Sequence, residues 1–169
     1  MIKTTILYQI LSYTLRHKWF VMKECFGEGL YLQGLLHDND KFRPSMLMSY
    51  GNFFYGKEKS PRNKDGYYKP NDTGYSKFEM SWHEHIHRNK HHWQWWLKQN
   101  DDGTKEILDM EERYIKEMIC DWVGAGKAQG FTSPKNNRFF ETRVWYDKNK
   151  DKMTLSPNTR KYVEEFIGL

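Results

Sequence analysis

Apolar side chains recur at steps of three and four residues along most of this chain, which is the spacing of one face of an α-helix. Near the N-terminus this stripe runs through Ile6, Ile10, Tyr13 and His17. The sequence contains no internal repeat, and no stretch alternates apolar and polar residues strongly, as a half-buried strand would. The pattern therefore predicts an all-α fold, a single-domain bundle of six to seven helices over residues 1–169.

Glycine and proline mark where these helices begin and end. Gly27 and Gly29 separate the first helix from a second apolar run at 30–36, and Pro44 stands where a first-turn proline opens a third helix. Further helices are predicted over the ranges 76–99, 110–129 and 137–150. A last helix opens with Ser156 as N-cap and Pro157 in its first turn, and it runs to Ile167.

Residues 56–74 form the one long segment without helical spacing, because Gly, Pro, Asn, Asp and Lys dominate it. Loops of this length in compact domains are either functional or disordered. The sequence leaves open whether this loop is flexible or forms a lid over an anionic substrate.

Aromatic residues supply much of the core in this chain of 169 residues, which has 7 Trp, 11 Tyr and 10 Phe. The net charge of +5 favours an anionic partner such as a nucleotide. The positive residues are spread along the chain, so nucleic acid is a partner that the sequence allows without indicating. A second copy of the chain is also left open, since small aromatic-rich domains often pair.

The two cysteines, Cys25 and Cys120, form no CxxC pair. Neither an export signal nor a stretch long enough to span a bilayer is present, so the sequence predicts reduced thiols and a cytoplasmic protein that does not enter the membrane.

Two histidines flank the predicted turn between the first two helices. Gly27 lies midway between His17 and His37, so an antiparallel hairpin would bring both to the same height, with Asp38 beside them. Two imidazoles and a carboxylate suit a divalent transition metal. Asp121 shares a helix face with apolar residues, and a carboxylate there is costly unless it is paired or bound to a metal.

If one helix extends from 76 to 99, the constant angle between successive residues gives the direction of each histidine about the helix axis. His85 and His92 then lie beside the apolar sector and are predicted to point inward, whereas His83, His87 and His91 fall on the opposite, solvated face. The alternative, in which His87 and His91 clamp a metal one turn apart, requires that solvated face to carry the site.

Other strings have structural interpretations. GAGKAQG at 124–130 resembles a phosphate loop, but Ala128 stands where Ser or Thr would bind magnesium, so small residues that allow close helix packing are the better interpretation. The tryptophans at 93, 95 and 96 are predicted to be core residues. The sequence shows no nucleophilic triad.

The ordered set His17, His37-Asp38 and Asp121 in an all-α chain resembles the HD superfamily of metal-dependent phosphohydrolases, and the string HDNDK adds Lys41. More narrowly, GLLHDNDKF, WHEHIHRNKHHWQWW, EMICDWVGAGKAQG and YDKNKDKMTL are similar to an uncharacterised family found in bacteria and their phages. The narrower resemblance implies no activity.

The HD resemblance implies hydrolysis of a nucleotide or related phosphate ester with one or two metal ions. Mixed histidine and carboxylate ligands suit manganese, iron or cobalt better than a structural zinc. It implies one ion on His17, His37, Asp38 and Asp121, with Asp38 bridging to a second. Lys41 would contact the phosphate, and His85 or His92 would complete the second site or protonate the leaving oxygen. The sequence departs from the superfamily in carrying His85 and His92 on one predicted helix. Two alternatives stay open. One is a di-iron oxygenase that acts on a small organic substrate, and the other is a non-catalytic module that binds a nucleotide or a protein, for which a phage origin is one option.

Overall fold

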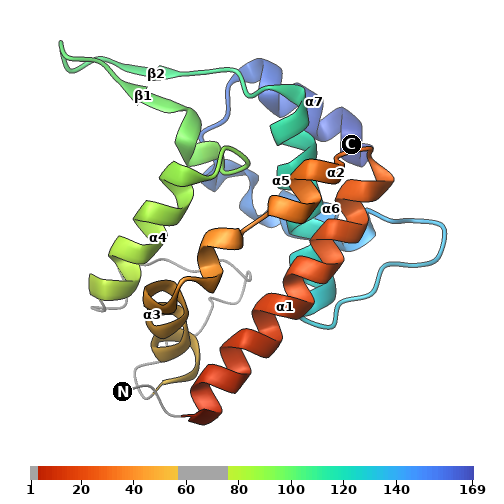
Figure 1. Cartoon of the computed structure of the whole chain (residues 1–169). Helices are drawn as coiled ribbons and strands as arrows, with labels where there is room; N and C mark the ends of the chain where they lie inside the picture. Colours follow the sequence, from red (N-terminus) through yellow and green to blue (C-terminus); the bar gives the residue numbers. More distant parts are fainter. Residues whose placement is uncertain (1–3, 57–75) are drawn as a thin grey trace.

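The chain forms seven α-helices and one short antiparallel hairpin in the part that the computed structural model describes, residues 4–56 and 76–169 (Figure 1). The helices are α1 (Thr4–Gly27), α2 (Tyr31–Leu36), α3 (Pro44–Tyr55), α4 (Ser76–Arg88), α5 (Glu112–Ala128), α6 (Phe140–Asn149) and α7 (Pro157–Ile167). The predicted helical single domain is confirmed. The loop predicted at 56–74 lies, apart from Gly56, outside the described residues.

Two helix starts follow the sequence signals. Pro44 is the first residue of α3, and Ser156 caps α7, where its hydroxyl accepts a hydrogen bond of 3.1 Å from the backbone N–H of Thr159. At the other end of α7, Gly168 takes a left-handed conformation with φ of 80°, which glycine adopts without steric cost. These helix boundaries were predictable because local chemistry sets them.

The prediction of one helix from 76 to 99 is wrong, because α4 ends at Arg88. The side-chain amide of Asn89 donates to the carbonyl oxygen of His85 at 2.9 Å and so competes with the helical backbone for that acceptor. The chain continues as a short 3₁₀ turn at Trp93–Trp96 and then as the hairpin of β1 (Leu97–Gln99) and β2 (Lys105–Ile107), in which Lys98 pairs with Glu106. The hairpin projects from the helical body (Figure 1).

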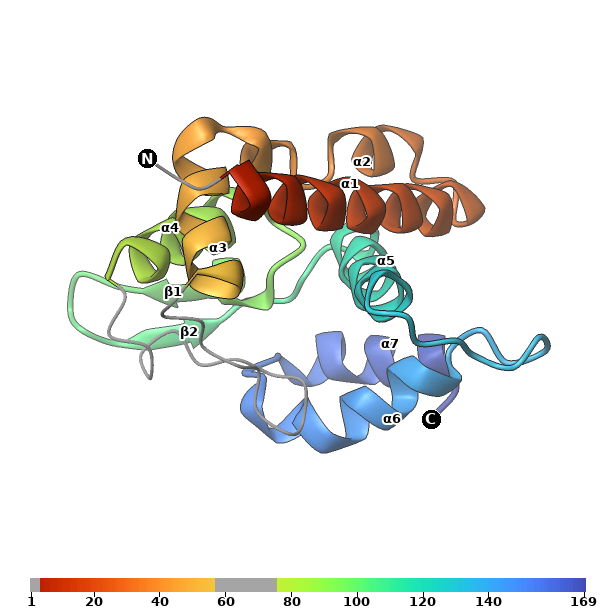
Figure 2. The same ribbon diagram turned by 90° about the horizontal axis from the view of Figure 1, so that it is seen from below.

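Helix α5 lies between two groups of helices. In Figure 2, α1 and α2 run along one side of it, and α6 and α7 along the other. One apolar cluster joins α5 to α6 and α7 through Ile119, Tyr146 and Val163, and Trp96 is buried in it with Trp93 and Trp95 packed against it. The core assignment of the tryptophans is therefore confirmed.

A second apolar cluster joins α1, α3 and α4 through Ile10, Phe53 and Phe78. The Phe53 and Phe78 rings stack with centroids 3.7 Å apart. The helices that carry the conspicuous histidines and acids are thus each anchored by apolar packing, α1 and α4 in this second cluster and α5 in the first. Such packing fixes the relative positions of polar side chains between them.

Helices α1 and α5 approach closely at Gly124. A Cβ atom at this position would lie 2.4 Å from Cγ2 of Val21 and 2.8 Å from its backbone nitrogen, so no larger residue fits without movement. This confirms the close-packing interpretation of the GAGKAQG string at Gly124.

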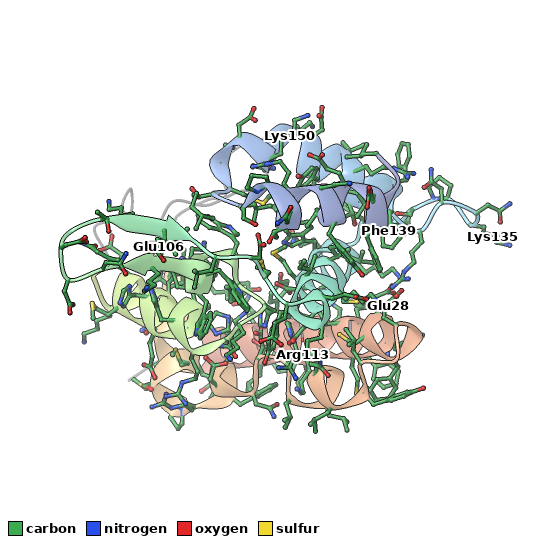
Figure 3. All side chains as sticks on the ribbon, turned by 90° about the horizontal axis from the view of Figure 1, so that it is seen from above. Glu28, Glu106, Arg113, Lys135, Phe139 and Lys150 are labelled. Atoms are coloured by element: carbon green, nitrogen blue, oxygen red, sulfur yellow. The ribbon has the colours of Figure 1, made fainter. Side chains whose placement is uncertain are left out.

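One turn further along the same interface, the carboxylate of Glu24 accepts from Lys127 Nζ at 2.5 Å and from Arg138 Nε at 2.7 Å. Arg138 also binds Glu28. Figure 3 labels Glu28 and Phe139, the residue that follows Arg138 in the sequence. The bridge ties the segment that leads into α6 to the end of α1.

Cys25 and Cys120 are both buried and both free thiols. Contact with the Cys120 thiol, together with burial, raises the pKa of Cys25 above its ordinary value. No helix in the described part of the chain is long and apolar enough to cross a membrane.

Candidate metal centre

The centre is built around the corner that follows α2. Asp38 is the one non-glycine residue with positive φ in the described ranges, with φ of 53°, a conformation that Asp tolerates better than most residues. The ammonium group of Lys18, on α1, donates to three acceptors at this corner, the carbonyl oxygens of Leu35 (2.9 Å) and His37 (2.8 Å) and Oδ1 of Asn39 (2.7 Å). The corner is therefore fixed from α1 as well as by its own backbone.

A first cluster consists of His17, His37, Asp38 and Asp121, with ligand atoms that all lie within 4.8 Å of one another. His17 Nε2 lies 3.0 Å from Oδ1 of Asp121 and 3.6 Å from Oδ2 of Asp38. His37 Nε2 lies 3.5 Å from the same two oxygen atoms. The cluster thus joins α1, the corner and α5.

A second cluster consists of Asp38, His85, His91 and His92, within the same distance limit. The other oxygen of Asp38, Oδ1, lies 3.4 Å from His85 Nε2 and 3.5 Å from His91 Nε2. His92 Nε2 lies 2.9 Å from His85 Nε2. Asp38 therefore belongs to both clusters and turns one carboxylate oxygen toward each.

These spacings suit metal ions. Donors held at 2.0–2.2 Å from a metal lie roughly 3.0–3.6 Å from one another, which is the range of the distances between the ligand atoms of Asp38 and its four histidine neighbours. All four of these distances exceed the roughly 2.7–3.2 Å typical of an N–H···O hydrogen bond.

Buried polar atoms that lack hydrogen bonds also indicate a metal site. The buried Nε2 atoms of His17, His37 and His91, and Oδ1 of Asp38, make no hydrogen bond of good geometry within the described part of the chain, although His17 Nε2 lies 3.0 Å from Oδ1 of Asp121. A buried polar atom left unpaired costs about 1–3 kcal/mol. Metal ions between these atoms would satisfy all four, so the donor set fits divalent metal.

The structure brings together all six predicted ligand residues, His17, His37, Asp38, His85, His92 and Asp121. Lys41, predicted to contact phosphate, lies beside them with its Nζ 2.5 Å from Oδ2 of Asp38. Of the residues assigned to the solvated face, His83 and His87 are exposed.

The prediction for His91 is wrong. Its side chain is buried and lies in the second cluster instead of facing solvent. The error follows from the end of α4 at Arg88, since residues 89–92 no longer obey the helical angle. The clamp of His87 and His91 is excluded for the same reason, because only one of the two faces the centre.

Sequence reasoning missed the acids behind the histidines. Glu117 Oε1 lies 3.0 Å from Nδ1 of His37 and 3.2 Å from Nδ1 of His91, and Asp40 Oδ2 lies 2.8 Å from Nδ1 of His85. One signal was available for Glu117, which stands one helical turn before Asp121. For Asp40 it was the second Asp of the HDNDK string.

Charges in the first cluster reinforce one another. Burial alone would lower the pKa of His37, but the carboxylates of Asp38, Asp121 and Glu117 outweigh burial and raise that pKa to about 10. Burial would raise the pKa of Asp38, yet His37, Lys41 and His85 hold it well below its usual range. His17 and His37 likewise hold the pKa of Asp121 well below its usual range, against the effect of burial.

The histidines of the second cluster behave differently. Burial, with help from the Lys41 charge, lowers the pKa of His85. Burial and the neighbouring His91 and His85 lower the pKa of His92 far below its ordinary value. Both rings are therefore neutral at physiological pH, and a neutral imidazole is the form that binds metal.

A cavity of about 1200 Å³ opens beside the two clusters. His17, His91, His92, Asp121 and Lys41 all line it. Its other lining residues include aromatic side chains from α1, α3 and α4, namely Tyr13, Tyr50, Phe54 and Trp82, and from α5 and α6, namely Trp122 and Trp145. The volume exceeds the roughly 300–1,000 Å³ of typical small-molecule pockets.

Comparisons with curated proteins and with solved structures gave no significant match. A family model, described as a family of unknown function (DUF5662), matches residues 7–169. That range contains every residue of both clusters, and it bears out the predicted similarity to a family without an assigned activity. Because the match covers nearly the whole chain, the protein belongs to the DUF5662 family.

Proposed function

We propose that this protein is a metal-dependent phosphohydrolase that acts on a nucleotide or a related phosphate ester. The observation that carries the proposal is the division of the Asp38 carboxylate, with Oδ2 facing one histidine and carboxylate cluster and Oδ1 facing the other. A carboxylate shared in this way can bridge two ions, and two-metal sites are typical of phosphoryl hydrolases. The resemblance to the HD superfamily supports the same reaction class.

Each cluster residue has a role in this proposal. His17, His37, Asp38 and Asp121 hold one ion, and Asp38, His85, His91 and His92 hold the other. Divalent ions at such sites generate a nucleophile at neutral pH and polarise phosphoryl oxygens. The lowered pKa values of His85 and His92 favour a role as ligands over a role as proton donor to the leaving oxygen.

Lys41 is the residue proposed to bind the transferred phosphoryl group. Its ammonium lies in the cavity wall next to Asp38, where it can stabilise the negative charge that builds on phosphate. Lys148 and Lys152 line the same cavity and extend its positive charge away from the clusters. A substrate with more than one phosphate could use both groups of lysines.

The aromatic lining supports a nucleotide as substrate. Trp82 lies against the second cluster, with its ring centroid 5.8 Å from that of His85 and 5.5 Å from that of His92. Flat aromatic walls bind bases by stacking, which contributes about 1–3 kcal/mol for each base. We expect the base between these walls and the phosphate at Lys41.

One observation favours a second candidate, a di-iron oxygenase. The cavity wall also contains apolar residues, Ile10, Ile86 and Met118, which suit a small organic substrate without phosphate. The same histidine and carboxylate ligands accept iron. This candidate predicts oxygen consumption by the iron-loaded protein and no release of phosphate.

The test measures metal content and phosphate release on the same preparations. Metal per chain is counted after reconstitution with manganese, iron or cobalt, and phosphate is assayed with nucleoside mono-, di- and triphosphates. The proposal expects one or two ions per chain and phosphate release that requires them, with Lys41→Ala weakening turnover more than metal binding. Metal binding without phosphate release from any of these substrates contradicts it. Nucleotide binding without turnover would instead support a binding module.

A further inference from the structure

Glu117 lies behind the two clusters and contacts one histidine of each. Its Oε1 atom is 3.0 Å from Nδ1 of His37, in the first cluster, and 3.2 Å from Nδ1 of His91, in the second. Its side chain is buried on α5, and the His37 and His91 rings lie side by side with centroids 4.4 Å apart. A single carboxylate oxygen therefore reaches both rings from the side away from Asp38.

The opposite nitrogen of each ring faces the shared carboxylate. His37 Nε2 lies 3.5 Å from Asp38 Oδ2, and His91 Nε2 lies 3.5 Å from Asp38 Oδ1. A carboxylate can only accept hydrogen bonds, so it favours the ring form that carries its proton on Nδ1. In the neutral ring that metal binding requires, the lone pair is then on Nε2, on the side of the ring that faces Asp38.

Asp40 offers a contrast within the same centre. Its Oδ2 lies 2.8 Å from Nδ1 of His85 and accepts from the side-chain amide of Asn89 at 3.2 Å. Its histidine contact is thus in the second cluster, where Glu117 supports His91. A carboxylate behind a metal-binding histidine fixes its ring and proton, and its loss typically lowers metal affinity about 10- to 100-fold.

We propose that Glu117 is a positioning residue shared by both metal sites, which orients His37 for one and His91 for the other, whereas Asp40 positions a ligand of the second site alone. The inference rests on the metal binding of the proposed function and is independent of the hydrolysis. The alternative use of the same atoms is a third metal held by His37, His91 and Glu117. That use requires the Nδ1 lone pairs, so neither ring could then donate from Nδ1 to Glu117.

The experiment first isolates each metal site with one substitution and then replaces the carboxylate of Glu117 or of Asp40. His17 belongs only to the first cluster and His92 only to the second, so His17→Ala leaves the second site and His92→Ala leaves the first. Glu117→Gln and Asp40→Asn are added to each of these two variants. Mn²⁺ affinity is measured by competition with a chelating dye, and circular dichroism checks the fold.

We expect Glu117→Gln to weaken Mn²⁺ binding about tenfold or more in both backgrounds. Asp40→Asn should weaken it to a similar degree only in the His17→Ala background. An effect of Glu117→Gln in one background alone, or in neither, overturns the proposal. So does a wild-type protein with three Mn²⁺ per chain that loses one ion in Glu117→Gln and holds the other two unchanged.

A second measurement needs no substitution, in case Glu117→Gln fails to fold. Nitrogen-15 spectra of the zinc-loaded wild-type protein report which ring nitrogen carries the proton. Nδ1–H on both His37 and His91 is expected, and Nε2–H on either one overturns the proposal. Zinc or manganese binding with these features but without phosphate release would refute the hydrolase function and leave this inference standing.

Discussion

The two clusters share Asp38 but are built in different ways. The first draws His17 and Asp121 from the interiors of two packed helices, α1 and α5. The second draws His91 and His92 from the irregular segment that follows the end of α4. Helix packing therefore sets the geometry of the first cluster, and the point at which one helix stops sets that of the second.

Their charges differ as well. The first cluster has two carboxylates and two imidazoles, and the pKa of His37 there is raised to about 10. The second has one carboxylate and three imidazoles, and the pKa values of His85 and His92 are lowered. Oxygen-rich sites suit manganese, whereas imidazole-rich sites suit iron and zinc. If both clusters hold metal, as proposed, we expect the two sites to differ in metal preference.

The largest effect is expected where the clusters meet. Asp38→Asn should lower metal affinity at both sites by about 100-fold or more, because it removes the charge that both sites share, and loss of even a carboxylate behind a ligand costs about 10- to 100-fold. Asn is chosen because it tolerates the left-handed backbone at this position. Metal per chain is counted by mass spectrometry. The exposed Asp102, in the hairpin turn, gives the matched control Asp102→Asn, which should keep full metal content.

If Asp38→Asn loses one ion and keeps the other at full affinity, then the carboxylate serves one site and is not shared. Retention of both ions would place the metal elsewhere in the chain.

The next effect should be confined to the first cluster. Gly124 follows Asp121 by one turn on α5, and Val21 follows His17 by one turn on α1, so the Gly124 contact sets the helix separation at which His17 meets Asp121. Gly124→Ala should push the helices apart, cost roughly 1–3 kcal/mol of stability and weaken metal binding at the first site.

Thermal unfolding and Mn²⁺ titration of the His92→Ala and His17→Ala backgrounds check this prediction. The control is Gly126→Ala on the same helix, where an added Cβ meets no atom within 4 Å. If Gly124→Ala weakens metal binding at the second site and leaves the first site intact, the Gly124 contact does not set the geometry of the first site.

A smaller effect should be confined to the second cluster. Asn89 ends α4 with its amide bonds to His85 O and Asp40 Oδ2, and this turn directs His91 and His92 toward Asp38. Asn89→Leu removes these bonds and introduces a strong helix former. We expect Mn²⁺ affinity to fall severalfold in the His17→Ala background and to stay unchanged in the His92→Ala background. The exposed His87 provides the control, His87→Ala, and an equal loss in that control would contradict the interpretation.

The same difference explains what the sequence could predict of the site. His17 and Asp121 lie on regular helices, where the spacing of apolar residues gives the direction of every side chain. His91 lies beyond Arg88, where a single turn changes the direction that a helical angle would assign. Glu117 meets a histidine 80 residues away in the sequence, and no local pattern encodes that contact.

The fold likewise has elements that the sequence predicts and elements that it does not. The starts of α3 and α7 were predictable because proline and a serine cap act within one turn. The hairpin was not, because its strands have three residues each and all six are exposed, which leaves no alternation of apolar and polar residues to detect.

The smallest effect tests whether the α1–α5 interface depends on charge beyond the first cluster. Burial would raise the pKa of Glu24, but its hydrogen bonds to Lys127 and Arg138 outweigh burial and lower it below the ordinary value of 4.5. A carboxyl whose pKa is lower in the folded than in the unfolded state stabilises the fold above the unfolded value, and this stabilisation is lost as pH falls through the folded value. Wild-type protein should therefore exceed Glu24→Gln in stability by roughly 1 kcal/mol at pH 7, with the difference shrinking below pH 4.5. Thermal melts of both proteins from pH 7 to pH 3 measure it. A difference that stays constant over this range would mean that Glu24 contributes by packing and not by its charge.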